Sequence, residues 1–339
     1  MERCPDGHPL ASVDDGRPMT IVGWLLVAGF GVALIVWGAE AFAEHLAVAS
    51  TRLGVSAFAL AILLAGAEPE ELATAVTASL RDAPAIALGD VIGANVAICL
   101  VALGVGAVLA PLPFDRRVRR YALAGVPAGV LAAVFAWDGA VSRVEGAVLV
   151  AAYVVFISTI WVIERQPPAL GETAELAEAE AELGGSVATS RRVGRELALV
   201  VAGVTAMAVG AVALVEGVRR ISDVEVTQTR LGLVVVGFAT AFELVVLAWS
   251  AARRGITAAV VAGVIGSFAY NVTMTLGAGA LARPLRVEDP ELLRGPWIAM
   301  LLSLVAVVAI GWRPQVIRRP GGALLLALYP VFVLGVLLL

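Results

Sequence analysis

Acidic side chains interrupt two stretches of this sequence that are otherwise apolar enough to cross a membrane. Glu68, Glu70 and Glu71 lie in the first stretch, and Glu243 lies in the second. One acid near the middle of a bilayer costs about 2.5 to 3.5 kcal/mol, so three in one span would cost roughly 8 to 10 kcal/mol without compensation. Cations can supply that compensation because carboxylates are natural cation ligands. The acids therefore indicate a cation-binding site inside the membrane.

Composition places the chain in a lipid bilayer. Of 339 residues, 60% are hydrophobic and only 15% are charged, with a mean hydropathy of +0.92. The formal net charge is -4, and no polybasic run suggests that the chain binds nucleic acid. The two cysteines, Cys4 and Cys99, are too few for a disulfide framework or a zinc site, so we expect no cofactor. The expected partners are the lipid bilayer and inorganic cations.

Apolar runs of about 20 residues, the length that spans the hydrocarbon core, predict ten transmembrane helices. They lie near residues 20–43, 55–80, 85–110, 120–137, 145–163, 196–218, 231–252, 256–282, 296–312 and 321–339. A polar insert falls between the fifth and sixth runs and divides the chain into two halves of five helices. The predicted organisation is a polar tail at 1–18, a first five-helix repeat at 19–163, a cytoplasmic acidic linker at 164–195 and a second five-helix repeat at 196–339.

Arginine placement predicts how the chain sits in the membrane. The densest basic cluster, at residues 116–120, and the central linker fall on the same side of the predicted spans. The positive-inside rule then places this side in the cytoplasm and both termini outside the cell. An odd number of helices in each half gives the halves opposite orientations. We therefore expect an all-α, multi-pass protein of the cell membrane, built as two inverted five-helix repeats.

Matching motifs support a repeat. The first half contains GDVIGANVAICLVALG at residues 89–104, and the second contains AGVIGSFAYNVTMTLG at residues 262–277. Each motif follows an acid-bearing segment and a short polar turn. Both are rich in small residues, which allow helix backbones to approach closely. The acids of the two halves are thus expected to meet at a pseudo-twofold axis.

These motifs resemble the paired repeats of the cation/calcium exchanger superfamily, which have the form GTSLPEL followed by GNVIGSNIFN. The resemblance covers roughly residues 54–104 and 231–280. It implies a secondary active cation antiporter that exchanges calcium for sodium or protons at a site near the midplane. Glu71 and Glu243 correspond to the family's site glutamates and are the expected metal ligands. Ser267 and Asn271 correspond to the ligand serine and the later ligand Asn or Asp.

The first repeat departs from the family pattern. The ligand serine is replaced by Ala94 and the ligand asparagine by Ile98, and the GTS segment reads GAE. The second repeat keeps Thr240 as the hydroxyl nearest to Glu243. Fewer neutral oxygen ligands in repeat one favour protons over sodium as the counter-ion.

Helical spacing brings other donors toward the two glutamates. Glu68 precedes Glu71 by three residues, and Ser267 precedes Asn271 by four, so each pair shares a helix face. The predicted cation-binding set is Glu68, Glu71, Thr240, Glu243, Ser267 and Asn271. Two acids are less directly indicated. Glu70 replaces Glu71 if the register shifts by one residue, and Asp90 either supplies a carboxylate or occupies a position that binds nothing.

Three other functions remain open. The chain could exchange only monovalent sodium and protons, or it could be a non-transporting scaffold or sensor that has lost ion binding through Ala94 and Ile98. A membrane enzyme with paired carboxylates is disfavoured because no nucleophile or His/Asp motif accompanies the acids. We therefore expect that the protein is not an enzyme.

Overall fold

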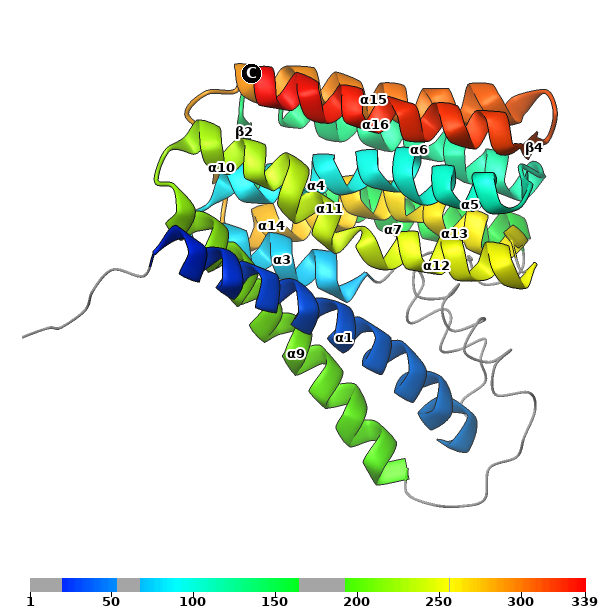
Figure 1. The fold of residues 1–339 in the computed structure, drawn as a ribbon, viewed down its shortest axis with the longest axis horizontal. Helices are drawn as coiled ribbons and strands as arrows, with labels where there is room; N and C mark the ends of the chain where they lie inside the picture. The colour runs from blue at the N-terminus through cyan, green and yellow to red at the C-terminus, as the bar shows by residue number, and fades with distance from the viewer. Residues whose placement is uncertain (1–19, 54–67, 165–192, 256) are drawn as a thin grey trace, which may run out of the picture.

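The computed structural model describes residues 20–53, 68–164, 193–255 and 257–339, and it confirms an all-α membrane protein (Figure 1). Within these residues, nine helices are long and apolar enough to cross a membrane. The expected span at 55–80 is described only from residue 68 onward, where it forms α3 (Pro69–Leu80). Nearly all of the predicted linker lies outside the described residues.

From α3 in the first half and α12 (Phe242–Arg254) in the second, the described elements of the two halves follow in the same order. The first half contains α1 (Ile21–Leu53), α3, α4 (Pro84–Ala97), the π-helical segment η1 (Ile98–Ala102), α5 (Leu103–Leu109), β1 (Leu112–Pro113), α6 (Arg116–Phe135), β2 (Ala140–Val141) and α7 (Arg143–Glu164). The second half contains α9 (Val193–Ile221), α10 (Glu225–Leu231), η2 (Gly232–Val236), α11 (Gly237–Thr240), α12 (Phe242–Arg254), α13 (Thr257–Tyr270), η3 (Asn271–Thr275), α14 (Leu276–Ala282), β3 (Leu285–Arg286), α15 (Glu291–Trp312), β4 (Val316–Ile317) and α16 (Arg319–Leu338).

Internal symmetry is visible in the lengths and pairing of these elements. The series α4, η1, α5 has 14, 5 and 7 residues, and so does the series α13, η3, α14. Strand β1 pairs with β4, and β2 pairs with β3, both antiparallel. A twofold operation that exchanges the halves converts one strand pair into the other. The halves are therefore repeats of one fold.

The central spans are the two that carry the matching motifs. In the most apolar window of each span, 83% of Pro84–Leu109 and 89% of Val261–Ala282 is buried, against 22% for Arg143–Ile163 and Arg319–Leu338. The small residues of the motifs permit this close packing. The outer spans, by contrast, present their apolar side chains to lipid.

Helices α1 and α9 form a separate pair that crosses the rest of the molecule at an angle (Figure 1). Glycines on both helices allow the two backbones to pack closely. A Cβ added at Gly203 would lie 2.6 Å from the carbonyl oxygen of Gly38, and one at Gly210 would lie 2.7 Å from that of Gly31. The seven-residue spacing on both helices keeps these glycines on one face, which gives a continuous small-residue interface.

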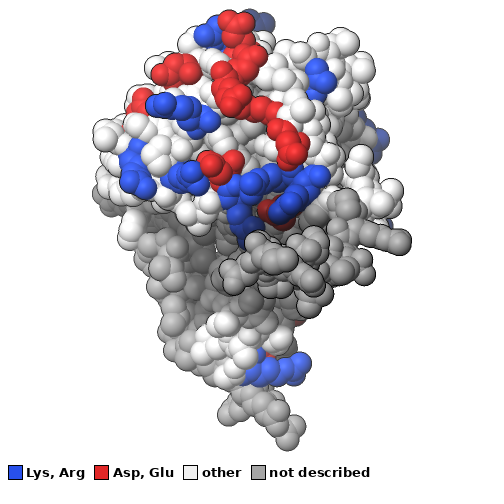
Figure 2. All heavy atoms as spheres, turned by 90° about the vertical axis from the view of Figure 1, so that its left-hand side faces the viewer, with Lys and Arg blue, Asp and Glu red and all other residues white. Residues whose placement is uncertain are grey.

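The start of α1 and the end of α16 lie at the same end of the helix bundle (Figure 1). Helix α1 begins and α16 ends at the left-hand side of Figure 1. Figure 2, which views this side, shows arginine and acidic side chains intermixed. Arg116, Arg254 and Arg319 lie at the opposite end, at the start of α6, the end of α12 and the start of α16.

Candidate cation-binding site

The first group of acids lies at the start of a short helix. Glu68 immediately precedes α3, and Glu70 and Glu71 occupy its first turn. Their exposed fractions are only 2%, 4% and 2%. Pro69 begins the helix because proline fits the first helical position, where no backbone N–H is needed. The positive end of the helix dipole therefore faces the acids and stabilises negative charge there.

Asp90 of α4 joins this group. Its side chain is 1% exposed, and Glu71 lies close enough to Asp90, Glu68 and Glu70 to interact with all three electrostatically. The Oγ1 of Thr240 donates a hydrogen bond of 2.9 Å to Oδ1 of Asp90. Oδ2 of Asp90 and Oε1 of Glu71 are buried and have no hydrogen-bond partner among the described residues. Both oxygens are thus available to a ligand.

The Asp90–Thr240 hydrogen bond connects the two repeats, and glycines make it possible. Helix α4 packs directly against η2 and α11. A Cβ at Gly89 would lie 2.9 Å from Cα of Gly232, and one at Gly237 would lie 2.7 Å from Cα of Gly93. Only residues without a side chain permit this approach, so the VIG motif serves to bring Asp90 within reach of Thr240.

Thr240 lies where a transmembrane helix is interrupted. Helix α11 ends at Thr240, Ala241 forms a turn, and α12 begins at Phe242. Glu243 is in the first turn of α12 and is half-buried. Acids of both repeats thus lie in the first turn of a helix, α3 in repeat one and α12 in repeat two. Transporters also use the ends of half-helices at their ion sites.

The neutral predicted ligands come from the second repeat. Ser267 of α13 and Asn271 of η3 are fully buried. Ser267 donates to the carbonyl of Gly263 at 3.2 Å, while Oδ1 of Asn271 accepts a hydrogen bond from Thr275 at 3.5 Å. The amide nitrogen of Asn271 has no partner among the described residues. Segment η3 packs against both α3 and α4, so it borders the acids of repeat one.

Sequence reasoning did not single out three further polar residues. Thr273 and Thr275 of η3 and Asn95 of α4 are buried, with at most 2% of each side chain exposed. Oδ1 of Asn95 has no partner among the described residues, while its Nδ2 donates to Val91 at 2.9 Å. Their signal was present in the sequence, because each is a polar residue within one of the two matching motifs, 89–104 and 262–277.

The internal symmetry changes how the glutamates are paired. Glu70 is the second residue of α3, and Glu243 is the second residue of α12. Because the starts of α3 and α4 are as far apart in sequence as the starts of α12 and α13, this spacing pairs Glu243 with Glu70, and Glu71 with Leu244. The sequence analysis had paired Glu243 with Glu71. Glu71 nevertheless lies within the buried acid group.

The same correspondence shows that the site is asymmetric. Glu71 and Asp90 match Leu244 and Gly263, which carry no charge, whereas Ser267 and Asn271 match Ala94 and Ile98. Repeat one thus supplies most of the acids, and repeat two supplies Glu243 together with hydroxyl and amide groups. Among the residues that the structure describes, no three His, Cys, Asp or Glu side chains form a ready-made metal cage. Ligands for a cation would therefore include the neutral oxygens of repeat two.

Comparisons with known proteins agree with this architecture. The family model described as sodium/calcium exchanger protein matches residues 23–162 and 196–338. An uncharacterised membrane protein of Methanocaldococcus jannaschii is 26% identical, with 90% of this chain and 93% of that protein covered. The sodium/calcium exchanger MaX1 of Methanosarcina acetivorans is 24% identical, over 93% of this chain and 98% of the relative.

Solved structures show the same fold. The sodium-calcium exchanger NCX_Mj, soaked with sodium and strontium, superposes with a TM-score of 0.58 at 22% identity, and the match covers 92% of this chain and 98% of that one. The two blocks of the family model fall on the two structural repeats. The chain belongs to the sodium/calcium exchanger protein family.

Proposed function

We propose that this protein is a secondary active antiporter that exchanges calcium for sodium or protons at the buried carboxylate site. The observation that carries the proposal is the hydrogen bond between Asp90 and Thr240, which joins the acids of one repeat to the broken helix of the other. A site shared by inverted repeats can open alternately to either side of the membrane. The name of the relative MaX1, a sodium/calcium exchanger, supports calcium and sodium as the exchanged ions.

The available ligands suit a hard cation. Calcium takes six to eight oxygens from carboxylates, backbone and amide carbonyls, and water. Glu70, Glu71 and Asp90 provide buried carboxylates, and Ser267 and Asn271 provide buried neutral groups nearby. Calcium and its counter-ion would compete for these ligands, and that competition couples the two fluxes.

A monovalent sodium/proton exchanger is the second candidate. It is favoured by the replacement of two family ligands in repeat one, where Ala94 and Ile98 offer no oxygen. A site with fewer neutral oxygens would hold calcium less well. Whether calcium competes with sodium or proton flux separates this candidate from the first. A non-transporting scaffold or sensor would show no flux at all.

The deciding experiment is uptake of calcium-45 into proteoliposomes under an imposed sodium gradient and, separately, a proton gradient. The native chain is compared with Glu70→Gln, Glu71→Gln and Glu243→Gln. Uptake that depends on one gradient and is lost in Glu70→Gln and Glu243→Gln supports antiport and identifies the counter-ion. Absence of calcium uptake under both gradients, in protein that still binds sodium, would transfer support to the monovalent exchanger.

The orientation predicted from arginine placement is also part of the proposal: both termini outside and the linker at 164–195 in the cytoplasm. This orientation is tested in a chain from which Cys4 and Cys99 have been removed. A single cysteine then replaces either Asp289 or Arg254, which lie at opposite ends of the helix bundle. In intact cells, a membrane-impermeant maleimide should label position 289 and not position 254. The reverse labelling would invert the proposed topology.

A further inference from the structure

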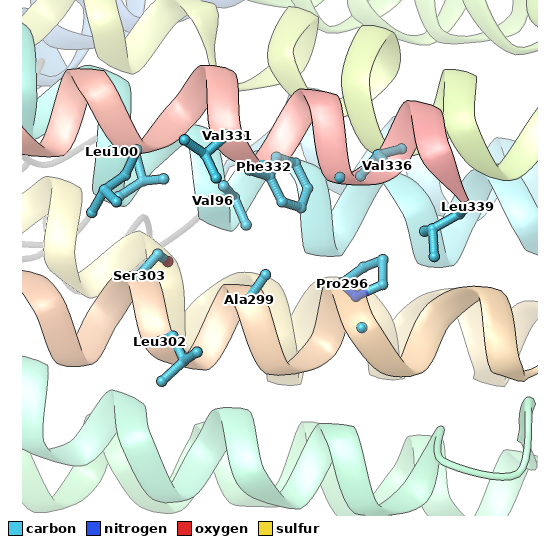
Figure 3. Close-up of a pocket in the computed structure, with 13 residues that line it drawn as sticks. Val96, Leu100, Pro296, Ala299, Leu302, Ser303, Val331, Phe332, Val336 and Leu339 are labelled. Atoms are coloured by element: carbon cyan, nitrogen blue, oxygen red, sulfur yellow. The ribbon is translucent and has the colours of Figure 1, made fainter.

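An apolar cavity of about 440 Å³ lies between α15, α16 and the central span formed by α4 and η1. Figure 3 shows Pro296 and Ala299 of α15 facing Phe332 and Val336 of α16 across it, with Val96 behind. Ser303 is the one hydroxyl in its lining, and this hydroxyl already donates to the carbonyl of Met300 at 2.6 Å. The cavity therefore offers an occupant no free polar group from a lining side chain.

The cavity opens toward lipid. Leu302 and Val331, which border it, are 59% and 63% exposed on the outer surface of the helix bundle. Within a membrane, such a surface contacts acyl chains and not water. The inner wall is different: Val96 and Leu100 are almost fully buried. The cavity thus leads from the lipid-facing surface to the central span.

The dimensions of the cavity match one membrane leaflet. Along α15 it extends from Gly295, near the helix start, to Ser303. At 1.5 Å per residue this is about 12 Å. Half of a hydrocarbon core that is about 30 Å thick is about 15 Å. The volume also falls in the range that ligand pockets occupy, about 300 to 1,000 Å³.

We propose that this cavity is a binding site for one acyl chain of a membrane phospholipid, from the leaflet on the side of the chain termini. An apolar void of this size forfeits van der Waals contacts along its whole lining, and a chain from the adjoining leaflet restores them. The chain would pack on Val96 and Leu100, in the same continuous span that carries Asp90. Lipid composition would thereby act on the helix that bears the cation site.

The test fills the cavity without disturbing the fold. Gly335 lines the cavity, and a Cβ added there would meet no atom within 4 Å. Gly335→Leu should therefore fold normally and exclude the acyl chain. Gly29, an exposed glycine of α1 with the same open surroundings, gives the matched control Gly29→Leu. Gly295→Leu is a second cavity-filling variant, because Gly295 also lines the cavity in open space.

Each protein is extracted from vesicles of phosphatidylethanolamine and phosphatidylglycerol, and the retained phospholipid is counted by native mass spectrometry. We expect the native chain and Gly29→Leu to retain one phospholipid that Gly335→Leu and Gly295→Leu lack. Equal retention in all four proteins, or none in the native chain, would overturn the proposal. A native dimer that only the cavity-filling variants dissociate would also overturn it, since a second copy would then occupy the cavity.

Discussion

Asp90 is the side chain at which the two repeats touch within the site. Both partners of its hydrogen bond to Thr240 are almost fully buried, and hydrogen bonds to charged groups contribute about 1.5 to 3 kcal/mol. In a double-mutant cycle with Asp90→Leu and Thr240→Val, each of which removes one partner of the bond, we expect the two changes to be non-additive by about this amount. The measurement is the free energy of unfolding in detergent. Thr240→Ser, which keeps the hydroxyl, is the control, and additive losses would show that the bond contributes nothing.

The pairing of Glu70 with Glu243 gives a second prediction. These two residues occupy matching positions at the starts of α3 and α12. Glu70→Gln and Glu243→Gln should therefore impair calcium uptake alike. Removing one charge from a buried ionic site costs about 2 to 5 kcal/mol, so the half-saturating calcium concentration should rise on the order of 30-fold or more.

Glu71→Gln serves as the comparison for that prediction, because Glu71 matches the uncharged Leu244. We expect it to change calcium dependence less than Glu70→Gln does. The structural pairing would be contradicted if Glu70→Gln took up calcium normally while Glu71→Gln took up none.

At the residue scale, sequence alone could indicate the site but not its register. Glu68, Glu70 and Glu71 stand out because each is costly in an apolar span. Which one matches Glu243 depends on the residue at which α3 begins, and two adjacent glutamates give no signal that distinguishes them. Asp90 stayed ambiguous for a related reason, since its role depends on a contact with Thr240 that is 150 residues away in sequence.

At the scale of helices, the contact between α4 and the η2–α11 segment determines the geometry of the site. A methyl group at Gly93 or Gly237 would collide with backbone atoms of the facing helix. Overpacking of this kind costs about 1 to 3 kcal/mol. We expect Gly93→Ala and Gly237→Ala to lower the melting temperature and to weaken calcium binding together.

Gly335→Ala is the control for these variants, because the added methyl group meets no atom within 4 Å. It should melt at or above the native temperature, since alanine favours helix more than glycine does. If Gly93→Ala and Gly237→Ala had the same melting temperature and calcium binding as this control, the close approach of α4 would be unimportant for the site.

Helix interruptions were the least predictable elements. Hydropathy located the spans, but nothing in the composition of Ile98–Ala102 or Asn271–Thr275 signals a π-helical segment. The same holds for the turn at Ala241, which has no proline or glycine. Such irregularities arise where tertiary packing, and not local propensity, decides the backbone hydrogen bonds. The π-helical segments η1 and η3 recur at matching positions in the two repeats, and the predicted ligand Asn271 begins η3.

At the scale of the whole molecule, α1 and α9 stand apart from the compact remainder (Figure 1). They are bound closely to each other by glycines and by a contact of 2.8 Å between His45 and Glu196. Helix α9 also packs against α3, and an exposed ion pair of 3.3 Å between Arg81 and Glu216 links it to the turn between α3 and α4. Exposed pairs of this kind contribute little, so this link is easily broken.

These contacts predict that α1 and α9 move as one body against the core during alternating access. Thiol cross-linking tests this motion in a chain that lacks Cys4 and Cys99. A short bifunctional thiol reagent that joins cysteines at His45 and Glu196 ties α1 to α9, and transport should persist. The same reagent joining cysteines at Arg81 and Glu216 ties α9 to the core, and transport should stop until the linker is cleaved. Both links involve α9, but only the Arg81–Glu216 link crosses the boundary between the pair and the core. Continued transport with the Arg81–Glu216 link in place would show that α9 does not move relative to the site.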